Sequence, residues 1–268
     1  MAEITEKKVE AKQGKIEISD GALIPDKGEK SVFSAWNIAF FGALFLLVLL
    51  PVLFPDPYWE IIQFIPDGVL TTFQVTLISI FFSIVVGLIA GLGRISRITI
   101  INRIATIYVE VIRGIPLLVQ LFYIYFALGQ FFHLPRITAA IAAMTICYGA
   151  YMGEIFRAGI LSVPKGQMEA ALALGMGRGQ AIRKVILPQT IRIILPPVGN
   201  EFIALLKDSS LVSILAVSDL LRRGREYAST SFHYFESYTI VALAYLVITL
   251  FLSRIVGIME EKVERRGR

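Results

Sequence analysis

The sequence predicts an all-α membrane protein with six transmembrane helices. Hydrophobic residues make up 56% of the 268 residues, and the mean hydropathy of +0.69 is far above that of an ordinary soluble domain. A helix needs about 20 apolar residues to cross ~30 Å of hydrocarbon. Four windows without any charged residue meet or approach this length, and we predict a span in each: 35–54, 68–93, 137–153 and 237–253.

Two further spans contain charged residues. Residues 107–128 are apolar except for Glu110 and Arg113, and we expect these two to form an ion pair because they lie three apart on one helix face. A kink at 114–116 follows them, and direct contact with a substrate is the alternative role for the pair. Residues 193–217 form the predicted sixth span, although they include Glu201, Lys207 and Asp208. An unpaired charge in the bilayer costs ~2.5–3.5 kcal/mol. Charges in these two spans are therefore candidates for function.

The distribution of lysine and arginine predicts that both termini are cytoplasmic. With an inside N-terminus, the inner segments contain seventeen basic residues near the spans and the outer loops contain four. Residues 1–34 include thirteen charged residues of almost balanced sign, which is typical of a solvated tail. We interpret 35–54 as an uncleaved anchor. The net charge of +5 is explained by inner loops that face anionic lipid, so no nucleic-acid partner is required.

The loop between the fourth and fifth predicted spans, 162–188, is unusually long and polar for such an apolar chain. Ser162 is a plausible N-cap with Pro164 close to the first helical position, and an alanine-rich helix follows. Gly175 then provides a stop after the helix, and a second short helix ends at Pro188. This pattern predicts a helix–turn–helix elbow on the cytoplasmic face. The alternative is an amphipathic loop that lies on lipid headgroups.

The elbow carries a recognisable pattern. Glu169-Ala170-Ala171, then Gly175, then the segment 185–188 (V-I-L-P) resembles the EAA loop of ABC importer permeases, with valine at 185 as the only departure. In that family the loop forms a coupling helix that sits in a cleft of the cytoplasmic ATP-binding subunit. The resemblance therefore implies that the following residues couple the chain to an ATPase: Glu169, Ala170, Ala171, Gly175, Leu187 and Pro188.

The resemblance extends over residues 66–262, which look like the five-helix core of the polar amino acid permeases of the histidine, glutamine and arginine uptake systems. The segments that carry it are 71–77, 87–94, 110–120, 151–160 and 200–203. Ile115 departs from the family, which usually has threonine before the proline. The tail 1–34 and the anchor 35–54 are additions to the core.

The resemblance implies the permease subunit of an ATP-driven importer for polar amino acids in the bacterial cytoplasmic (inner) membrane. Two copies of an ATP-binding subunit would bind ATP and magnesium, an extracytoplasmic binding protein would deliver substrate, and a second permease subunit, identical or a sibling, would complete the pathway. The chain itself has no phosphate-binding loop, because residues 175–179 lack the GxxxxGK[ST] spacing and follow a helix. We expect neither an enzymatic site nor a cofactor on it. The alternatives are an ABC permease for another small polar solute, and a secondary transporter that uses the intramembrane charges.

Polar residues of the sixth span are the main candidates for the substrate path. Pro196 and Pro197 are expected to break the helix just before these polar residues and to expose backbone carbonyls. Part of this polar cluster could line a dimer interface instead. A zwitterionic substrate needs a cation for its carboxylate, here Lys207, and an anion for its ammonium group. The candidate residues are Asn200, Glu201, Lys207, Asp208 and Ser209, together with Gln120 and Glu154, for which an ion pair with Arg157 is the alternative.

Three arginines, Arg222, Arg223 and Arg225, lie in the outer loop 218–237, against the usual charge bias. We expect them to contact the binding protein, with a solvated helix end as the alternative. His133 and His233 are a hundred residues apart without ligand-like neighbours, so no metal site is expected. The single cysteine, Cys147, falls within a span and cannot form an intrachain disulfide.

Overall fold

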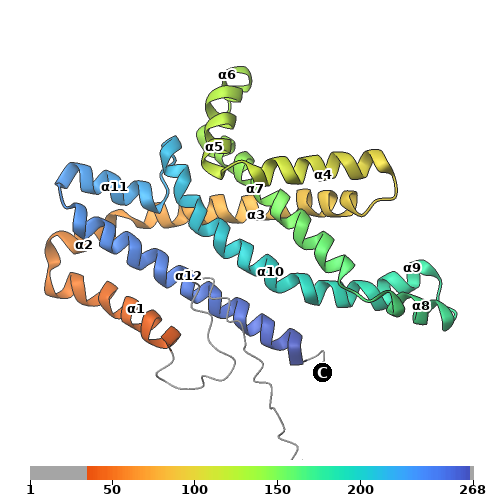
Figure 1. The fold of residues 1–268 in the computed structure, drawn as a ribbon. Coiled ribbons are helices and arrows are strands. Elements are labelled where there is room, and N and C mark those ends of the chain that lie inside the picture. Colours follow the sequence, from red (N-terminus) through yellow and green to blue (C-terminus); the bar gives the residue numbers. More distant parts are fainter. Residues whose placement is uncertain (1–34, 266–268) are drawn as a thin grey trace, which may run out of the picture.

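The computed structural model describes residues 35–265, and in this part of the chain every regular element is a helix (Figure 1). The predicted tail 1–34 lies outside the described residues. Within them, the prediction of an all-α protein is confirmed.

Four helical segments are long and apolar enough to cross a membrane. They are α1 (Ala35–Leu53), α2 (Pro55–Phe64) together with α3 (Pro66–Arg94), α7 (Arg136–Leu161) and α12 (Tyr234–Arg265). A fifth span is possible from α4 (Thr99–Gly114) and the helices α5 (Leu117–Phe122), η1 (Tyr123–Leu128) and α6 (Gly129–Phe132), which continue it after a bend of 103°. The described residues therefore contain four or five candidate spans. The predicted sixth span corresponds to α10 (Leu187–Asp208) and η3 (Ser209–Leu215), which do not pass the same test.

Helices α3 and α7 form the centre of the bundle, and they approach closely because glycines face the contact. A Cβ atom added at Gly87 would lie 2.3 Å from the Cβ atom of Met152, and one at Gly91 would lie 2.8 Å from the carbonyl oxygen of Gly153. Small residues allow this kind of close packing between helices in a membrane. Around the contact, buried residues of α3, α5, α7, α10 and η3 make up the main apolar core.

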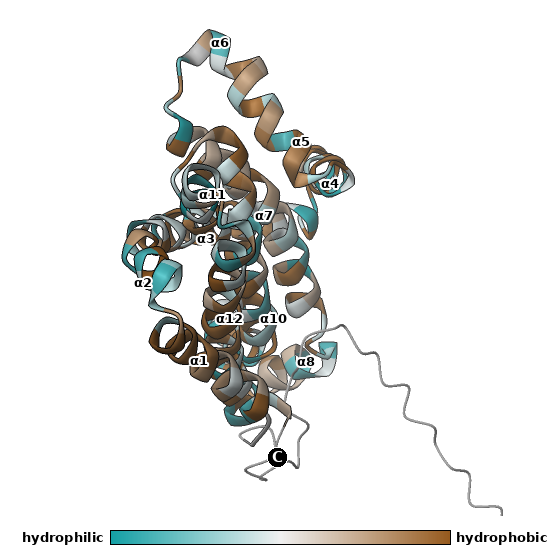
Figure 2. Cartoon of the chain, turned by 90° about the vertical axis from the view of Figure 1, so that its left-hand side faces the viewer, coloured by the Kyte–Doolittle hydropathy of each residue, from teal (hydrophilic) through white to brown (hydrophobic). Residues whose placement is uncertain are grey.

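The N-terminal helix α1 packs along α12 at the edge of the bundle (Figure 1). The indole Nε1 of Trp36 donates to the backbone oxygen of Leu250 at 3.2 Å, and the guanidinium carbon of Arg254 lies 5.4 Å from the centre of the Trp36 ring. Most other residues of α1 are exposed, and the brown colour of α1 in Figure 2 shows that it is apolar. This is the surface expected of a helix that faces lipid.

The elbow consists of α8 (Lys165–Ala173), α9 (Arg178–Ala181) and η2 (Ile182–Ile186), and η2 runs directly into α10. Two expectations about its ends are wrong. Ser162 is not the N-cap of the elbow helix but ends α7, and Pro164 occupies the N-cap position of α8. Pro188 does not end a helix but is the second residue of α10, directly after the π-helical turn η2, in which the N–H of Leu187 donates to the oxygen of Ile182 five residues back.

The expected helix break at Pro196 and Pro197 is also absent, since both prolines lie inside α10. Packing on two sides explains why the helix continues: Gly159 of α7 lies against Ile194, and Gly199 lies against Val256 of α12. This packing supports the helix on both sides of the two positions whose backbone hydrogen bonds the prolines remove.

Helix α11 (Leu220–Ser231) closes the opposite end of the bundle from the elbow (Figure 1). The buried Asp219 caps it, accepting from the backbone N–H groups of Arg222 at 3.0 Å and Leu221 at 3.2 Å. The N–H of Leu220 donates to the hydroxyl of Thr72 on α3 at 3.1 Å. These bonds fix α11 to the start of α3.

Candidate functional site

A cavity of about 480 Å³ lies between the α4–α5 bend, α7 and α10. Its wall includes three charged side chains, whereas two apolar cavities elsewhere on the bundle have none. The lining residues are Arg113, Gly114, Ile115, Pro116, Leu117, Cys147, Tyr148, Tyr151, Glu201, Ala204 and Asp208.

The bend that forms one wall follows from the sequence around Pro116. Steric conflict with the proline ring disfavours a helical conformation in the residue before it, and Ile115 is extended, with φ −107° and ψ 128°. The amide nitrogen Nε2 of Gln120 donates to the backbone oxygens of Ile112 at 2.9 Å and Ile115 at 2.8 Å, which satisfies carbonyls at the end of α4. The predicted kink is confirmed. Gln120, a candidate for the substrate path, supports this wall from behind and does not line the cavity.

The cation of the cavity is Arg113, on the last turn of α4. Its guanidinium carbon lies 5.2 Å from the centre of the Tyr151 ring on α7, within the range of a cation–π interaction. The expected ion pair with Glu110 is wrong, because no ion pair joins the two residues. The bend directly after α4 turns its last residues toward α7, where the aromatic face competes for the guanidinium, and Glu110 stays exposed.

The anions of the cavity are Glu201 and Asp208, two turns apart on one face of α10. The hydroxyl of Tyr148 donates to the Asp208 carboxylate at 2.7 Å, which fixes the orientation of that carboxylate. One guanidinium and two carboxylates therefore face a space large enough for a small polar molecule. An arrangement of this kind can bind a ligand that carries both an anionic and a cationic group.

Three other candidates on this segment lie outside the cavity wall. Asn200 and Lys207 are exposed and point away, because each precedes a lining residue by one position and so lies about 100° around the helix. Ser209 is fully buried, and its hydroxyl donates to the backbone oxygen of Leu206 at 2.7 Å. The structure thus brings Glu201 and Asp208 together and separates them from the remaining members of the predicted cluster.

Glu154 does not line the cavity and belongs to an ion-pair cluster between α3 and α7. The Nε of Arg157 donates to its carboxylate at 3.1 Å, and Arg94 of α3 forms a second ion pair with it. The ion pair proposed for Glu154 and Arg157 is confirmed. Arg94 was missed because it is sixty residues away in the sequence.

The elbow has an exposed turn with defined geometry. Helix α8 ends in a Schellman motif, in which the N–H of Met176 donates to the oxygen of Ala171 at 3.1 Å and the N–H of Gly175 donates to that of Leu172 at 3.0 Å. Gly175 has φ +80°, as a glycine after a helix end commonly does, so the predicted stop is confirmed. Of the candidate coupling residues, Ala171 is buried, whereas the other five are exposed: Glu169, Ala170, Gly175, Leu187 and Pro188.

The elbow also exposes apolar side chains. Leu174, between α8 and α9, is 80% exposed, and Leu172 of α8, Ile182 of η2 and Leu187 at the start of α10 are exposed as well. Exposed apolar side chains among polar ones are typical of a surface that binds another protein.

Two of the three arginines of α11 are engaged within the chain. Arg222 forms an ion pair with Glu226 at 2.7 Å, and Arg223 forms one with Asp67 at 3.0 Å. Arg225 is exposed. Their contact with a binding protein stays a prediction.

The histidines lie apart from the charged cavity. His133 is at the end of α6 with φ 48°, and Nδ1 of His233 lies 3.8 Å from the carboxylate of Glu236. Among residues 35–265, no group of three or more potential ligands could hold a metal ion. Cys147 is buried in the wall of the cavity.

A charged cavity inside a bundle of membrane-crossing helices, with an exposed elbow at one end, defines the membrane component of a solute transporter. Residues 83–265 match the family described as the binding-protein-dependent transport system inner membrane component, and the chain belongs to this family. The prediction of an ABC-type permease subunit is confirmed. The chain is a transport component of the membrane rather than an enzyme.

Individual relatives support this membership. The chain is 41% identical over 209 residues to the glutamine transport system permease protein GlnP of Escherichia coli (strain K12), a match that covers 77% of this chain and 95% of that protein. It is 36% identical over 214 residues to the L-cystine transport system permease protein TcyB of Bacillus subtilis (strain 168), covering 77% and 92%. It is 35% identical over 205 residues to the arginine transport system permease protein ArtQ of the same organism, covering 76% and 94%.

Solved structures show the same fold. The crystal structure of an amino acid ABC transporter with histidines contains a chain that is 42% identical, with a TM-score of 0.72, and the match covers 76% of this chain and 95% of that one. An inward-facing structure of the MetNI methionine ABC transporter is 23% identical with a TM-score of 0.63, and the match covers 77% and 97%. At that identity the second match shows the fold alone.

Proposed function

We propose that this chain forms the path by which an ATP-driven importer carries polar amino acids across the cytoplasmic (inner) membrane. The observation that carries the proposal is the cavity in which Arg113 faces Glu201 and Asp208. The relatives named for glutamine, cystine and arginine transport support the same class of substrate.

The cavity is complementary to an amino acid in its zwitterionic form. Arg113 provides donors for the α-carboxylate, and a carboxylate of α10 accepts from the α-ammonium group. Tyr148 holds Asp208 in place, which leaves Glu201 free to adjust to the rest of the substrate. The second carboxylate gives the wall a net negative charge and favours substrates with an additional cationic group.

The elbow is the proposed site of coupling to the ATPase. A cleft in a cytoplasmic ATP-binding subunit would cover the exposed apolar tip around Leu174 and contact the carboxylate of Glu169. Two such subunits would bind ATP and magnesium, and their closure would move α8 and α9. Because η2 continues into α10, a displacement of the elbow reaches Glu201 and Asp208 through a single helix.

The proposal also includes a membrane topology and two further partners. Both termini and the elbow are assigned to the cytoplasmic side, and α11 with the exposed Arg225 to the side that receives the extracytoplasmic binding protein. The core 66–262 then has five spans, of which α10 with η3 is the least apolar, and α1 is an added sixth. A second permease subunit, identical or a sibling, would complete the pathway.

The test is uptake by proteoliposomes that contain the chain together with its co-expressed ATP-binding subunit and purified binding protein. Asp208→Asn and Glu201→Gln are each expected to raise the half-saturating amino acid concentration about 10- to 100-fold, since a hydrogen bond to a charged group contributes ~1.5–3 kcal/mol. The matched control is Glu110→Gln, an exposed carboxylate on α4 outside the cavity. Uptake that ran on an ion gradient without ATP, or equal effects of all three variants, would contradict the proposal.

A panel of amino acids tests the charge argument separately. Arginine or lysine is expected to compete better than glutamine, and Glu201→Gln is expected to reduce this preference. If glutamine competed equally in both proteins, the second carboxylate would have no role in selection.

A further inference from the structure

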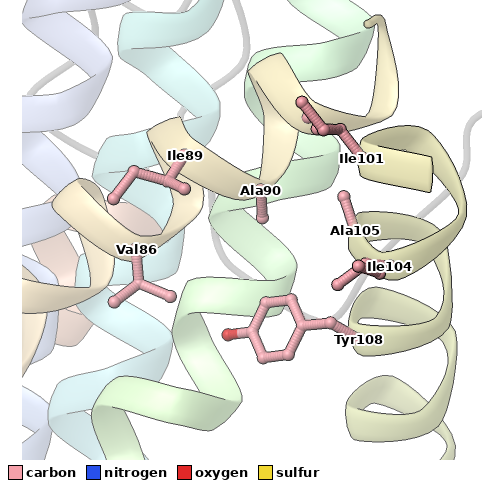
Figure 3. Close-up of a pocket in the computed structure, with 8 residues that line it drawn as sticks. Val86, Ile89, Ala90, Ile101, Ile104, Ala105 and Tyr108 are labelled. Atoms are coloured by element: carbon pink, nitrogen blue, oxygen red, sulfur yellow. The ribbon is translucent and has the colours of Figure 1, made fainter. Parts of the chain in front are cut away.

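An apolar groove of about 390 Å³ runs between α3 and α4, separate from the charged cavity. Figure 3 shows the side chains of the two helices on either side of it, with α7 passing behind. The lining residues are Val86, Ile89, Ala90, Gly93, Ile101, Ile104, Ala105 and Tyr108.

The groove offers almost no polar atoms to an occupant. The hydroxyl of Tyr108 donates to the backbone oxygen of Ile146 at 2.7 Å, so its bonding capacity is directed into the protein. The rim is apolar as well, since Ile89 is 68% exposed and Ile104 is 64% exposed. Both helices belong to candidate membrane spans. The surroundings therefore favour a hydrocarbon chain in the groove.

The short connection between the two helices, residues 95–98, carries the opposite chemistry. Arg97 lies on this connection, and Arg103 lies near the start of α4. Both are exposed, and neither forms an ion pair with another residue of the described chain. Arg94, by contrast, is paired with Glu154. Two uncompensated guanidinium groups therefore lie at the end of the helix pair that flanks an apolar groove.

We infer that this groove is a binding site for an anionic phospholipid. One acyl chain lies between α3 and α4, and the headgroup phosphate contacts Arg97 and Arg103, in the way that basic residues at the membrane surface bind anionic lipid. The inference rests on the topology proposed above, which places the connection 95–98 at the cytoplasmic leaflet. A lipid in this position would fill the space between α3 and α4 where the two helices do not touch.

The helices do touch at one end of the groove. A Cβ atom added at Gly93 would lie 2.8 Å from the Cβ atom of Ala105, so this glycine permits the contact. This contact fixes the spacing of α3 and α4 at that end, while the rim at Ile89 and Ile104 stays open to the bilayer. We expect it to be retained through purification in detergent.

The experiment is native mass spectrometry of the full-length chain, purified with its co-expressed subunits and titrated with phosphatidylglycerol or phosphatidylcholine of identical acyl chains. Wild-type protein is expected to bind phosphatidylglycerol more tightly. Arg97→Gln and Arg103→Gln are each expected to weaken its binding about fivefold, and to leave phosphatidylcholine unchanged. Arg136→Gln, which removes an exposed arginine at the other end of the bundle, is the matched control.

The apolar part of the site has its own pair of variants. Ile101→Trp fills the groove and is expected to weaken the binding of both lipids, whereas Ile100→Trp changes the neighbouring, non-lining residue and is expected to have no effect. Equal binding of both lipids to wild type, or no effect of Ile101→Trp, would overturn the inference. So would a disulfide cross-link between two permease chains through Ile104→Cys in a Cys147→Ser background, because the groove would then be covered by protein. Lipid binding is measured without ATP or amino acid, so its failure is distinguishable from failure of the proposed function.

Discussion

The contact between α3 and α7 provides the sharpest test of the structure. Gly87→Ala places a methyl group where the nearest atom is the Cβ of Met152, at 2.3 Å, with the backbone of Met152 and Gly153 at 3.0 Å. Ordinary contacts between such atoms begin near 3.4 Å. None of these atoms is the end of a flexible side chain, so the two helices must separate by about 1 Å.

The magnitude follows from two opposing effects. Overpacking in a close contact costs about 1–3 kcal/mol, and this contact is at the upper end because the clash is with Cβ and backbone. Alanine gains up to ~1 kcal/mol over glycine in a helix interior. We therefore expect Gly87→Ala to lose about 2 kcal/mol of stability.

The assay is thermal unfolding of the purified chain in detergent, with Gly257→Ala as the matched control. Gly257 lies in α12 with no atom within 4 Å of an added Cβ, so this variant retains only the gain in helix propensity. The melting temperature of Gly87→Ala is expected to fall by about 4–8 °C, while that of Gly257→Ala stays equal or rises slightly. Equal melting temperatures of the two variants would refute the close approach of α3 and α7.

Three further predictions concern the elbow, the ion-pair cluster and the cap of α11. Gly175→Ala places a Cβ at φ +80° and costs ~1–2 kcal/mol in the turn. We therefore expect ATP hydrolysis stimulated by the loaded binding protein to fall several-fold. The control is Gly177→Ala, at φ −67° in open space, which is expected to leave this hydrolysis unchanged. Glu154→Gln removes two partly exposed ion pairs and is expected to lower the free energy of unfolding by about 1–2 kcal/mol, measured by thermal unfolding. A decrease below about 0.3 kcal/mol would contradict a stabilising ion-pair cluster between α3 and α7. Burial raises the pKa of Asp219, which lies outside the spans, from 3.8 to about 6. The folded chain therefore holds the proton of Asp219 more tightly than the unfolded chain does, and the free energy of unfolding falls as the pH rises from about 4 to 6. This group accounts for up to about 3 kcal/mol of the fall, and Asp219→Asn is expected to abolish that part of the pH dependence. Identical pH profiles of the variant and wild type would refute this assignment.

The features that could be predicted from the sequence depend on local chemistry. Uncharged windows predict the most apolar spans because each charge in lipid is costly. The glycine at 175 predicts the end of α8, since only glycine reaches a positive φ without strain. The pairing of Glu154 with Arg157 follows from their spacing on one helix.

The features that were missed depend on contacts between distant segments. The prolines at 188, 196 and 197 were predicted to end or break helices. Pro188 instead lies in the first turn of α10, and Pro196 and Pro197 lie inside α10 where it packs on α7 and α12. The cavity needed the bend after Arg113 to bring α4 against α7. A signal was present, since Tyr148 and Tyr151 lie near one face of an otherwise apolar span and Arg113 directly precedes a glycine and a proline.

The bend between α4 and α5 also affects how this type of permease can diverge. Gly114 has no side chain and lines the cavity with main-chain atoms alone, and these cannot be deleted by substitution. The part of the wall that substitution can change lies on α7 and α10, in side chains such as Tyr148, Tyr151 and Glu201. Under the proposed function, single exchanges at these positions would alter which amino acid is accepted without changing the bent main chain.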